Sequence, residues 1–393
     1  GQYSTGFCMF VRSCRYRAKK RDMREIAKNK ERGASVMKKL VALLLSVMMC
    51  FACVSALADT YVSWYTYGDV YLSSVRSEME ADFAKLNLTI NGSDANGNQQ
   101  VQSDFISTAL MNNDCEAIVV NLVESGAIST AQTIMNQIQA AGIPTVWFNR
   151  PVSTNNEEAA NLFLNNPASA FVGTNFEDAG VMQGELIGQY LVEHYNDIDL
   201  NGDGKISYIM FKGDEANQEA IARTALAVEY ANKALVAAGK PEIEFYDASN
   251  ANKYLVDPNG SWSNVFSSEQ MQTVLSMYNE GNGNMVELVI CNNDDMAYGA
   301  VMALQNAGYN HGEGTTAIPV FGVDATDVAK DLINNGYMVG TIKQDNVGMA
   351  DAVATITANL IAGKENKFEG LNENYVIVDN WFVQIPYAVY TGE

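Results

Sequence analysis

Histidine is almost absent from this chain: among 393 residues only His194 and His311 occur. A histidine-rich zinc site, or a reaction that needs a histidine as acid–base catalyst, therefore has little material. The phosphate-binding patterns G-x-G-x-x-G, after the first predicted strand, and G-x-x-x-x-G-K-[ST] are missing, and so is the G-x-S-x-G turn of serine hydrolases. We therefore expect neither a nucleotide site nor an enzyme.

Cysteine and positive charge are scarce beyond residue 58. Only Cys115 and Cys291 lie there, each beside an apolar run, so we expect buried free thiols, with a disulfide between them as the alternative. Residues 1–58 contain 12 Lys and Arg against 3 Asp and Glu, whereas residues 59–393 contain 13 against 43. Residues 59–393 are therefore strongly acidic and repel nucleic acid and anionic membrane surfaces, so we expect neither as a partner.

The beginning of the chain follows the pattern of an export signal. Met37 is followed by two lysines and an apolar run, and Ala56-Leu57-Ala58 matches a small-x-small cleavage site. We interpret residues 37–58 as a signal peptide and residues 1–36 as non-native upstream sequence. A membrane anchor is the alternative for the apolar run, and its two cysteines leave a lipid anchor open. The protein is then expected to be periplasmic or otherwise extracytoplasmic.

Strand-like and helix-like segments alternate along the rest of the chain. Runs rich in β-branched and aromatic residues predict strands at residues 61–67, 88–91, 117–122, 144–148, 171–174, 206–211, 243–246, 286–291, 318–323, 339–343 and 376–386. Helical periodicity predicts helices between most of them, for example at residues 73–86, 127–141, 219–238, 294–307 and 347–362. The alternation predicts an α/β fold with parallel sheets covered by helices on both faces. Its length exceeds one such domain, so we expect two similar doubly wound lobes.

Polar side chains follow four of the predicted strands. Asp69 and Asn149 do so in the first half of the chain, and Asn293 and Asp324 in the second. Open α/β sheets bind ligands beyond the carboxyl ends of their strands, so these residues predict a polar cleft shared by both halves. Helix N-caps are the alternative explanation for each of them.

A nine-residue stretch matches most of a calcium-binding loop. It carries the pattern D-x-N-x-D-G of EF-hands, in which oxygens at positions 1, 3, 5, 7 and 9 surround the ion and the glycine allows a sharp turn. The predicted ligands are Asp199, Asn201, Asp203, Lys205 through its backbone carbonyl, and Ser207. Position 12 is Met210 where EF-hands have glutamate, so another segment must supply the last carboxylate. A solvated turn without metal is the alternative.

Taken together, these stretches make the chain similar to the periplasmic galactose/glucose-binding proteins of sugar ABC transporters. The resemblance covers essentially residues 58–387, and its most specific part is the calcium loop combined with Phe321-Gly322-Val323-Asp324. It implies a type I periplasmic binding protein with two Rossmann-like lobes joined by three crossings. The lobes would comprise residues 59–172 with 346–383, and residues 175–343 with 387–393.

The resemblance also implies the ligands. Glu287 would complete a Ca²⁺ site. The sugar would contact Asp69, Tyr71, Asn149, Arg223, Trp262, Asn293 and Asp324, and also Asn217, Glu219 and Gln344, which stand where the family has histidine, aspartate and asparagine. Carboxylates, amides and arginine suit hydroxyl groups that donate and accept hydrogen bonds together. The three replacements leave the identity of the hexose open.

The implied function is capture of glucose or galactose between the lobes and delivery to an ABC permease by a monomeric protein. A sensor that presents the sugar to a chemoreceptor or a histidine kinase is the alternative, because the ligand would be the same and only the partner would differ.

Overall fold

The structure is a computed structural model that describes residues 58–392. The segment before the predicted signal peptide, and the signal peptide itself up to Leu57, lie outside the described residues. Ala58, the last residue of that predicted peptide, is the first residue of strand β1.

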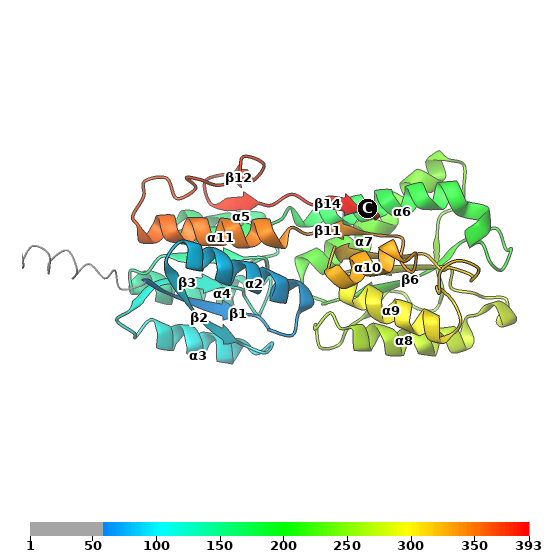
Figure 1. Ribbon diagram of the computed structural model, residues 1–393, viewed down its shortest axis with the longest axis horizontal. Helices are drawn as coiled ribbons and strands as arrows, with labels where there is room; N and C mark the ends of the chain where they lie inside the picture. Colours follow the sequence, from blue (N-terminus) through cyan, green and yellow to red (C-terminus); the bar gives the residue numbers. More distant parts are fainter. Residues whose placement is uncertain (1–57, 393) are drawn as a thin grey trace, which may run out of the picture. The chain divides into compact units, whose positions relative to one another are not determined.

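The N-terminal lobe is built on a seven-stranded sheet with the order β12-β13-β5-β4-β3-β1-β2 (Figure 1). Its strands are β1 (Ala58–Trp64), β2 (Leu88–Asp94), β3 (Cys115–Val120), β4 (Thr145–Phe148), β5 (Ser169–Gly173), β12 (Val376–Val378) and β13 (Phe382–Gln384). All neighbouring strands are parallel except the β12–β13 pair.

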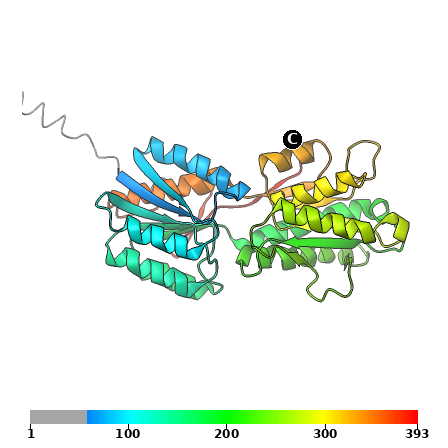
Figure 2. The ribbon, with the colours of Figure 1, turned by 90° about the horizontal axis from the view of Figure 1, so that it is seen from below.

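Helices cover both faces of this sheet because alternate residues of its strands face opposite sides. Helices α2 (Val70–Lys85) and α11 (Asn346–Ile361) pack with Val62, Val119 and Val146. On the other face, α3 (Gln99–Ala109), α4 (Ile128–Ala140) and α5 (Asn156–Leu164) pack with Ile118 and Trp147. Figure 2 shows the blue helix α2 and the cyan helices on opposite sides of the strands.

The C-terminal lobe repeats this plan with the strand order β14-β11-β10-β9-β6-β7, and β8 pairs with β6. Its strands are β6 (Ser207–Lys212), β7 (Glu244–Phe245), β8 (Leu255–Val256), β9 (Leu288–Cys291), β10 (Val320–Asp324), β11 (Gly340–Lys343) and β14 (Ala388–Tyr390). Helices α6 (Phe176–Ile198) and α7 (Gln218–Ala237) cover one face. Helices α8 (Asn264–Met277), α9 (Asp294–Asn306) and α10 (Asp327–Asn334) cover the other, and a short 3₁₀ helix, η1 (Glu280–Asn282), follows α8.

The chain crosses between the two sheets three times. The first crossing lies between β5 and α6, the second between β11 and α11, and the third between β13 and β14. Each crossing contains only two or three residues, namely 174–175, 344–345 and 385–387. The predicted fold class, two doubly wound α/β lobes of the type I periplasmic binding protein kind, is confirmed.

Of two further predictions, the one on the cysteines is confirmed and the one on the last strand is wrong. Cys115 and Cys291 are both free and buried, as predicted. The single strand predicted at residues 376–386 is wrong, because Asp379 and Asn380 adopt positive φ of 46° and 60° and turn the chain into the β12–β13 hairpin. Two positive φ values in a row are the geometry of a type I′ turn, in which asparagine and aspartate are favoured.

No helix within residues 58–392 is both long enough and apolar enough to cross a bilayer.

Glycine allows helices α6 and α7 to lie unusually close together. Gly180, Gly184 and Gly188 recur every fourth residue of α6 and are buried against α7. A Cβ atom at Gly184 would lie 2.7 Å from the carbonyl oxygen of Ala227 and from Cβ of Tyr230. The backbone carbonyl has little freedom to move, so the contact excludes any side chain.

We predict that Gly184→Ala destabilises the protein, by about 1–3 kcal/mol, since overpacking costs this much in a tight interior. Helix propensity alone predicts the opposite sign, a gain of up to about 1 kcal/mol. Urea denaturation followed by circular dichroism distinguishes the two, with Glu185→Ala at an exposed neighbouring position as control. A Gly184→Ala protein as stable as the parent would show that α6 and α7 are not in close contact.

Candidate functional site

One cavity between the two sheets is lined by polar side chains from both lobes. All ten residues predicted to contact a sugar line it, together with Leu72 and Arg150. The N-terminal lobe contributes Asp69, Tyr71 and Asn149; the C-terminal lobe contributes Asn217, Glu219, Arg223, Trp262, Asn293 and Asp324; and Gln344 lies on the second crossing. The space between these side chains, including solvent at its mouth, is about 350 Å³.

Three of these residues begin helices. The side chain of Asp69 accepts a hydrogen bond from the backbone N–H of Leu72 (2.8 Å), and Asn293 accepts one from Met296 (3.0 Å). Asn217 caps α7 in the same way. The two explanations offered by the sequence are therefore compatible, because a capping side chain has one oxygen fixed by the helix while its remaining groups face the cavity.

Three of the ten non-glycine residues with positive φ in residues 58–392 line the cavity. Asn149, Trp262 and Asp324 have φ values of 62°, 56° and 124°, which are uncommon for residues other than glycine. Such conformations persist only where the surrounding structure enforces them, and they cluster at functional sites. Here they direct three side chains from separate loops into one cavity.

The guanidinium of Arg223 occupies the centre of the site. Its Nη1 donates to the carbonyl oxygen of Asn292 (2.9 Å), and its Nη2 donates to Oε1 of Gln344 (3.1 Å) and to the Tyr387 hydroxyl (3.2 Å). Oε2 of Glu219 lies 3.6 Å from Nη2. Burial lowers the pKa of Arg223, but its acidic and phenolic neighbours more than offset this and raise the pKa overall, so Arg223 is a buried cation.

Several polar atoms of the cavity have no partner. The Tyr71 hydroxyl, Nε of Arg223 and Nε2 of Gln344 are buried without a hydrogen bond; they are three of nine such side-chain atoms in residues 58–392. Buried polar groups in native proteins are nearly always paired. All three groups can donate a hydrogen bond, and the Tyr71 hydroxyl can also accept one, so they indicate a polar ligand that supplies acceptors.

Burial also raises the pKa of two carboxyl groups that line the cavity. It raises the pKa of Asp69, and it raises the pKa of Asp324 well above its usual range although the charge of Arg223 opposes the shift. The neighbouring Asp294 is better satisfied, since it accepts hydrogen bonds from the Thr341 hydroxyl (2.6 Å) and the Thr326 backbone (2.8 Å). A ligand that donates to Asp324 would stabilise its ionised form.

Arg150 is a site residue that the sequence analysis missed. Its Nε donates to the carbonyl oxygen of Leu122 (2.7 Å) within the N-terminal lobe, and its Nη2 lies 3.5 Å from Oδ2 of Asp214 in the C-terminal lobe. The Tyr65 ring packs under its guanidinium at 3.9 Å, and the Tyr65 hydroxyl donates to the carbonyl oxygen of Gly260 (2.6 Å). The available signal was an arginine directly after Asn149 at a strand end.

Trp262 belongs to the core although its neighbours in sequence are polar. It lies between Ser261 and Ser263, but its side chain is buried and belongs to the apolar cluster that includes Phe211 and Met296. Any side chain at Gly213 would overlap the indole ring, so the ring lies flat on that backbone. The positive φ of Trp262 turns the side chain back from the loop, so one ring both packs in the core and lines the cavity.

The predicted calcium loop is folded by hydrogen bonds from its backbone N–H groups to its own side-chain oxygens. Asp199 accepts hydrogen bonds from the backbone N–H groups of Asp203 (3.1 Å) and Gly204 (2.9 Å), and Asp203 accepts one from Lys205 (2.9 Å). Oδ1 of Asn201 also accepts from the Asp203 N–H (3.0 Å). These bonds turn the side-chain oxygens toward the inside of the loop. Gly204, at the position where EF-hands require glycine, has a φ of 82°.

Glu287 lies directly against this loop. Its Oε1 accepts from the backbone N–H groups of Leu200 (2.8 Å) and Asn201 (3.2 Å), and its Oε2 accepts from Ser207 (3.0 Å). The hydroxyl of Ser207 donates to the carbonyl oxygen of Met285. No group of three or more His, Cys, Asp and Glu side chains in the described part of the chain is arranged to hold a metal. The oxygen set nevertheless contains two aspartates, a glutamate, an amide, a hydroxyl and a carbonyl, the hard ligands that suit Ca²⁺.

The chain matches the family model for the periplasmic binding protein domain over residues 60–365. It belongs to this family. Among its relatives, the D-galactose/methyl-galactoside binding periplasmic protein MglB of Haemophilus influenzae is 30% identical over 306 residues, which cover 77% of this chain and 81% of that protein.

Solved structures of periplasmic binding proteins have the same fold. A solute-binding protein of an ABC transporter from Clostridium phytofermentans, with bound β-D-glucose, has a TM-score of 0.64 at 17% identity and covers 85% of this chain and 94% of its own. A solute-binding protein of an ABC transporter from Bacillus halodurans C-125, with bound myo-inositol, has a TM-score of 0.61 at 21% identity. The match covers 86% of this chain and 95% of that protein's chain.

We predict that Tyr71→Phe leaves the ligand-free protein as stable as the parent or more stable, because the substitution removes a buried hydroxyl that has no partner. The matched control is Tyr61→Phe, which removes a hydroxyl bonded to Asp114 and Asn112 at 2.9 Å each. The control should lose about 0.5–1.5 kcal/mol of unfolding free energy. Chemical denaturation without added sugar measures both, and a larger loss in Tyr71→Phe than in the control would contradict the assignment.

Proposed function

We propose that this periplasmic binding protein captures one aldohexose, glucose or galactose, in the polar cavity and delivers it to an ABC permease without any chemical step. The observation that carries the proposal is the cavity itself, where eleven polar or aromatic side chains converge and three buried polar atoms lack partners.

The types of side chain suit a hexose. Asp69 and Asp324 can accept hydrogen bonds from hydroxyls, and Arg223 can donate to them. Trp262 offers an aromatic surface for the C–H patches of the ring. The relative named for D-galactose and the neighbours solved with glucose and myo-inositol support a cyclic polyol as the ligand class.

Contacts between the lobes at the rim of the cavity support a mechanism of closure. The Tyr65 hydroxyl reaches the Gly260 carbonyl, and the Asn217 amide reaches the Ser125 hydroxyl at 3.3 Å. A sugar that bonds to residues of both lobes binds the closed arrangement better than an open one, so it shifts the population toward closure. A permease that recognises the closed form would then distinguish loaded from empty protein.

Isothermal titration calorimetry with a panel of hexoses, pentoses and myo-inositol tests the proposal. We expect a 1:1 complex with glucose or galactose and weaker binding of the other compounds. Absence of heat at millimolar concentrations of every compound would refute sugar binding, and preference for a pentose or inositol would refute the choice of hexose.

We predict that Asp324→Ala weakens sugar binding by on the order of 2–5 kcal/mol, because it removes the buried charged acceptor of a sugar hydroxyl and one of the acidic neighbours of Arg223. Asp327→Ala is the matched control, since the Asp327 side chain is 99% exposed and lies outside the polar cavity. Titration of both variants with the preferred hexose measures the effect. Equal affinity of Asp324→Ala and parent would remove Asp324 from the site.

We also propose that the loop binds Ca²⁺ as a structural ion through Asp199, Asn201, Asp203, the carbonyl of Lys205, Ser207 and Glu287. The inward orientation of the loop oxygens and the position of Glu287 support this. Bound Ca²⁺ would neutralise the repulsion between these carboxylates, and burial and Asp199 both raise the pKa of Glu287. The ion would link the end of α6 to the strand that follows and to β9.

We predict that calcium raises the melting temperature and that a chelator lowers it, because an ion that binds only the folded state stabilises by mass action, about 2.7 kcal/mol at a concentration 100 times its Kd. Glu287→Gln should lose most of this response. Glu244→Gln should keep it, since Glu244 is an exposed partner of the Lys205 side chain. A melting temperature indifferent to chelator, with no calcium in the purified protein, would eliminate the proposal.

A further inference from the structure

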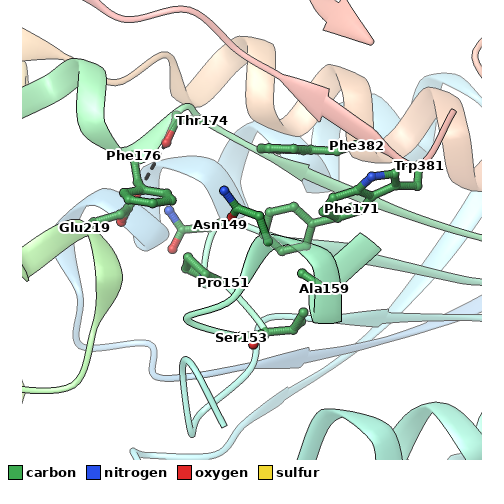
Figure 3. A pocket seen from close by; sticks show the side chains of 12 residues that line it. Asn149, Pro151, Ser153, Ala159, Phe171, Thr174, Phe176, Glu219, Trp381 and Phe382 are labelled. Carbon is green, nitrogen blue, oxygen red and sulfur yellow. Dashed lines mark hydrogen bonds between the residues drawn. The ribbon is translucent and has the colours of Figure 1, made fainter. Parts of the chain in front are cut away.

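A second cavity adjoins the polar one near the first and third crossings. Its empty volume is about 450 Å³. Seven of its twelve lining residues are apolar or aromatic, among them Phe171, Phe176, Trp381 and Phe382. In Figure 3, Phe171, Trp381 and Phe382 lie together on one side of the pocket, and Phe176 and Glu219 lie on the other.

Aromatic packing holds the wall of this cavity in place. Trp381 is stacked on Phe163 with ring centroids 5.2 Å apart, and Phe171 meets Phe382 edge to face at 5.3 Å. Such contacts fix ring orientations. The cavity is therefore a preformed apolar chamber, the usual character of a small-molecule site.

Asn149 and Glu219 line both cavities. Glu219 is held in place, because its Oε1 accepts from Thr174 (3.1 Å) and Tyr387 (3.3 Å). The side-chain amide of Asn149 makes no hydrogen bond within residues 58–392, and it is not among the fully buried unpaired atoms, so it is accessible from the cavities that it lines. A free amide between a polar and an apolar chamber suits a ligand that occupies both, with a polar atom where the two chambers meet.

The geometry points to a glycoside as this ligand: the sugar ring in the polar cavity, its glycosidic oxygen near Asn149, and an aromatic or medium-length alkyl aglycone in the second cavity. This inference rests on the proposed function, since it assumes that the polar cavity holds the sugar. It assigns the apolar cavity to the aglycone of the same molecule.

A second sugar ring is the competing occupant, and the walls disfavour it. A second ring needs partners for several hydroxyls, but both hydroxyl groups of the lining are already engaged, which leaves the two amides of the lining, Asn149 and Asn156, as groups with no hydrogen bond within residues 58–392. Ser153 donates to Oε2 of Glu158 at 2.8 Å and accepts from the backbone of Asn155, and Thr174 is bonded to Glu219 and Tyr387. The aromatic walls instead favour an apolar group, whose burial removes apolar surface from water.

Calorimetric competition among defined glycosides tests the inference. The probes are glucose and galactose, their α- and β-methyl glycosides, their α- and β-phenyl glycosides, and the disaccharides maltose and lactose. We expect one phenyl anomer to bind at least tenfold tighter than the methyl glycoside of the same sugar and anomer. Equal affinity, or weaker binding of both phenyl anomers, would overturn the inference, and so would a disaccharide that binds tighter than the phenyl glycosides.

Two variants test whether the tighter binding of the phenyl glycoside depends on the second cavity. Phe176→Ala removes part of the wall and Ala159→Leu narrows the chamber; neither residue lines the polar cavity. Each should reduce the phenyl-to-methyl affinity ratio at least threefold with little effect on the free hexose. Leu164→Ala, at an exposed position of the same helix as Ala159, should leave the ratio unchanged. An unchanged ratio in Phe176→Ala would contradict the assignment even if Ala159→Leu fails to fold.

Sugar binding in the polar cavity and aglycone binding in the second cavity are refuted by different results. If neither hexose nor any glycoside binds, the proposed function is wrong and the inference falls with it. If a hexose binds and the phenyl glycosides show no gain, only the aglycone site is wrong.

Discussion

The buried guanidinium of Arg223 is the interaction on which the arrangement around the cavity depends. It bonds to Gln344 on the second crossing and to Tyr387 on the third. Tyr387 and Glu219 in turn bond to Thr174 on the first crossing. All three crossings therefore belong to one network of hydrogen bonds, and its members Arg223, Glu219 and Gln344 line the polar cavity. Removing the cation would leave buried acceptors unpaired, a larger loss than that of one hydrogen bond.

This network explains how binding and movement of the lobes can be coupled. A ligand that bonds to Nε of Arg223 or Nε2 of Gln344 contacts groups that are fixed to the crossings, so its contacts depend on the angle between the lobes. Other contacts between the lobes, from Tyr65 to Gly260 and from Arg150 to Asp214, lie at the rim and hold no crossing residue. Under the proposed function, the first set would link the ligand to the crossings, and the second would stabilise a closed arrangement at the edge of the cavity.

The sequence predicted much of this because the fold follows simple rules. Alternating strands and helices indicate parallel sheets, whose carboxyl ends are where Asp69, Asn149, Asn293 and Asp324 lie. Gln344, which only the resemblance identified, lies on a crossing, where no local periodicity marks it. The position of Glu287 beside the loop, 80 or more residues along the chain, likewise depends on the order of strands in the sheet.

Other features could not be read from local sequence at all. Arg150 is buried only because two backbone carbonyls and a carboxylate from the other lobe surround it, and each of these is distant in sequence. Trp262 stands in a polar loop, but a positive φ and the absence of a side chain at Gly213 direct its ring into the core. In both cases contacts with residues distant in the sequence determine that the side chain is buried, which the composition of the local segment does not predict.

The central claim is that the polar cavity between the lobes is where a hexose binds. A crystal structure of the mature protein grown with glucose or galactose tests it most directly. We predict one sugar ring bonded to Asp324, Arg223 and Asn149, with the Trp262 indole beside the ring and the Tyr71 hydroxyl within hydrogen-bonding distance of it. A sugar bound elsewhere on the surface, or a closed cavity filled only by water in the presence of saturating sugar, would contradict the account.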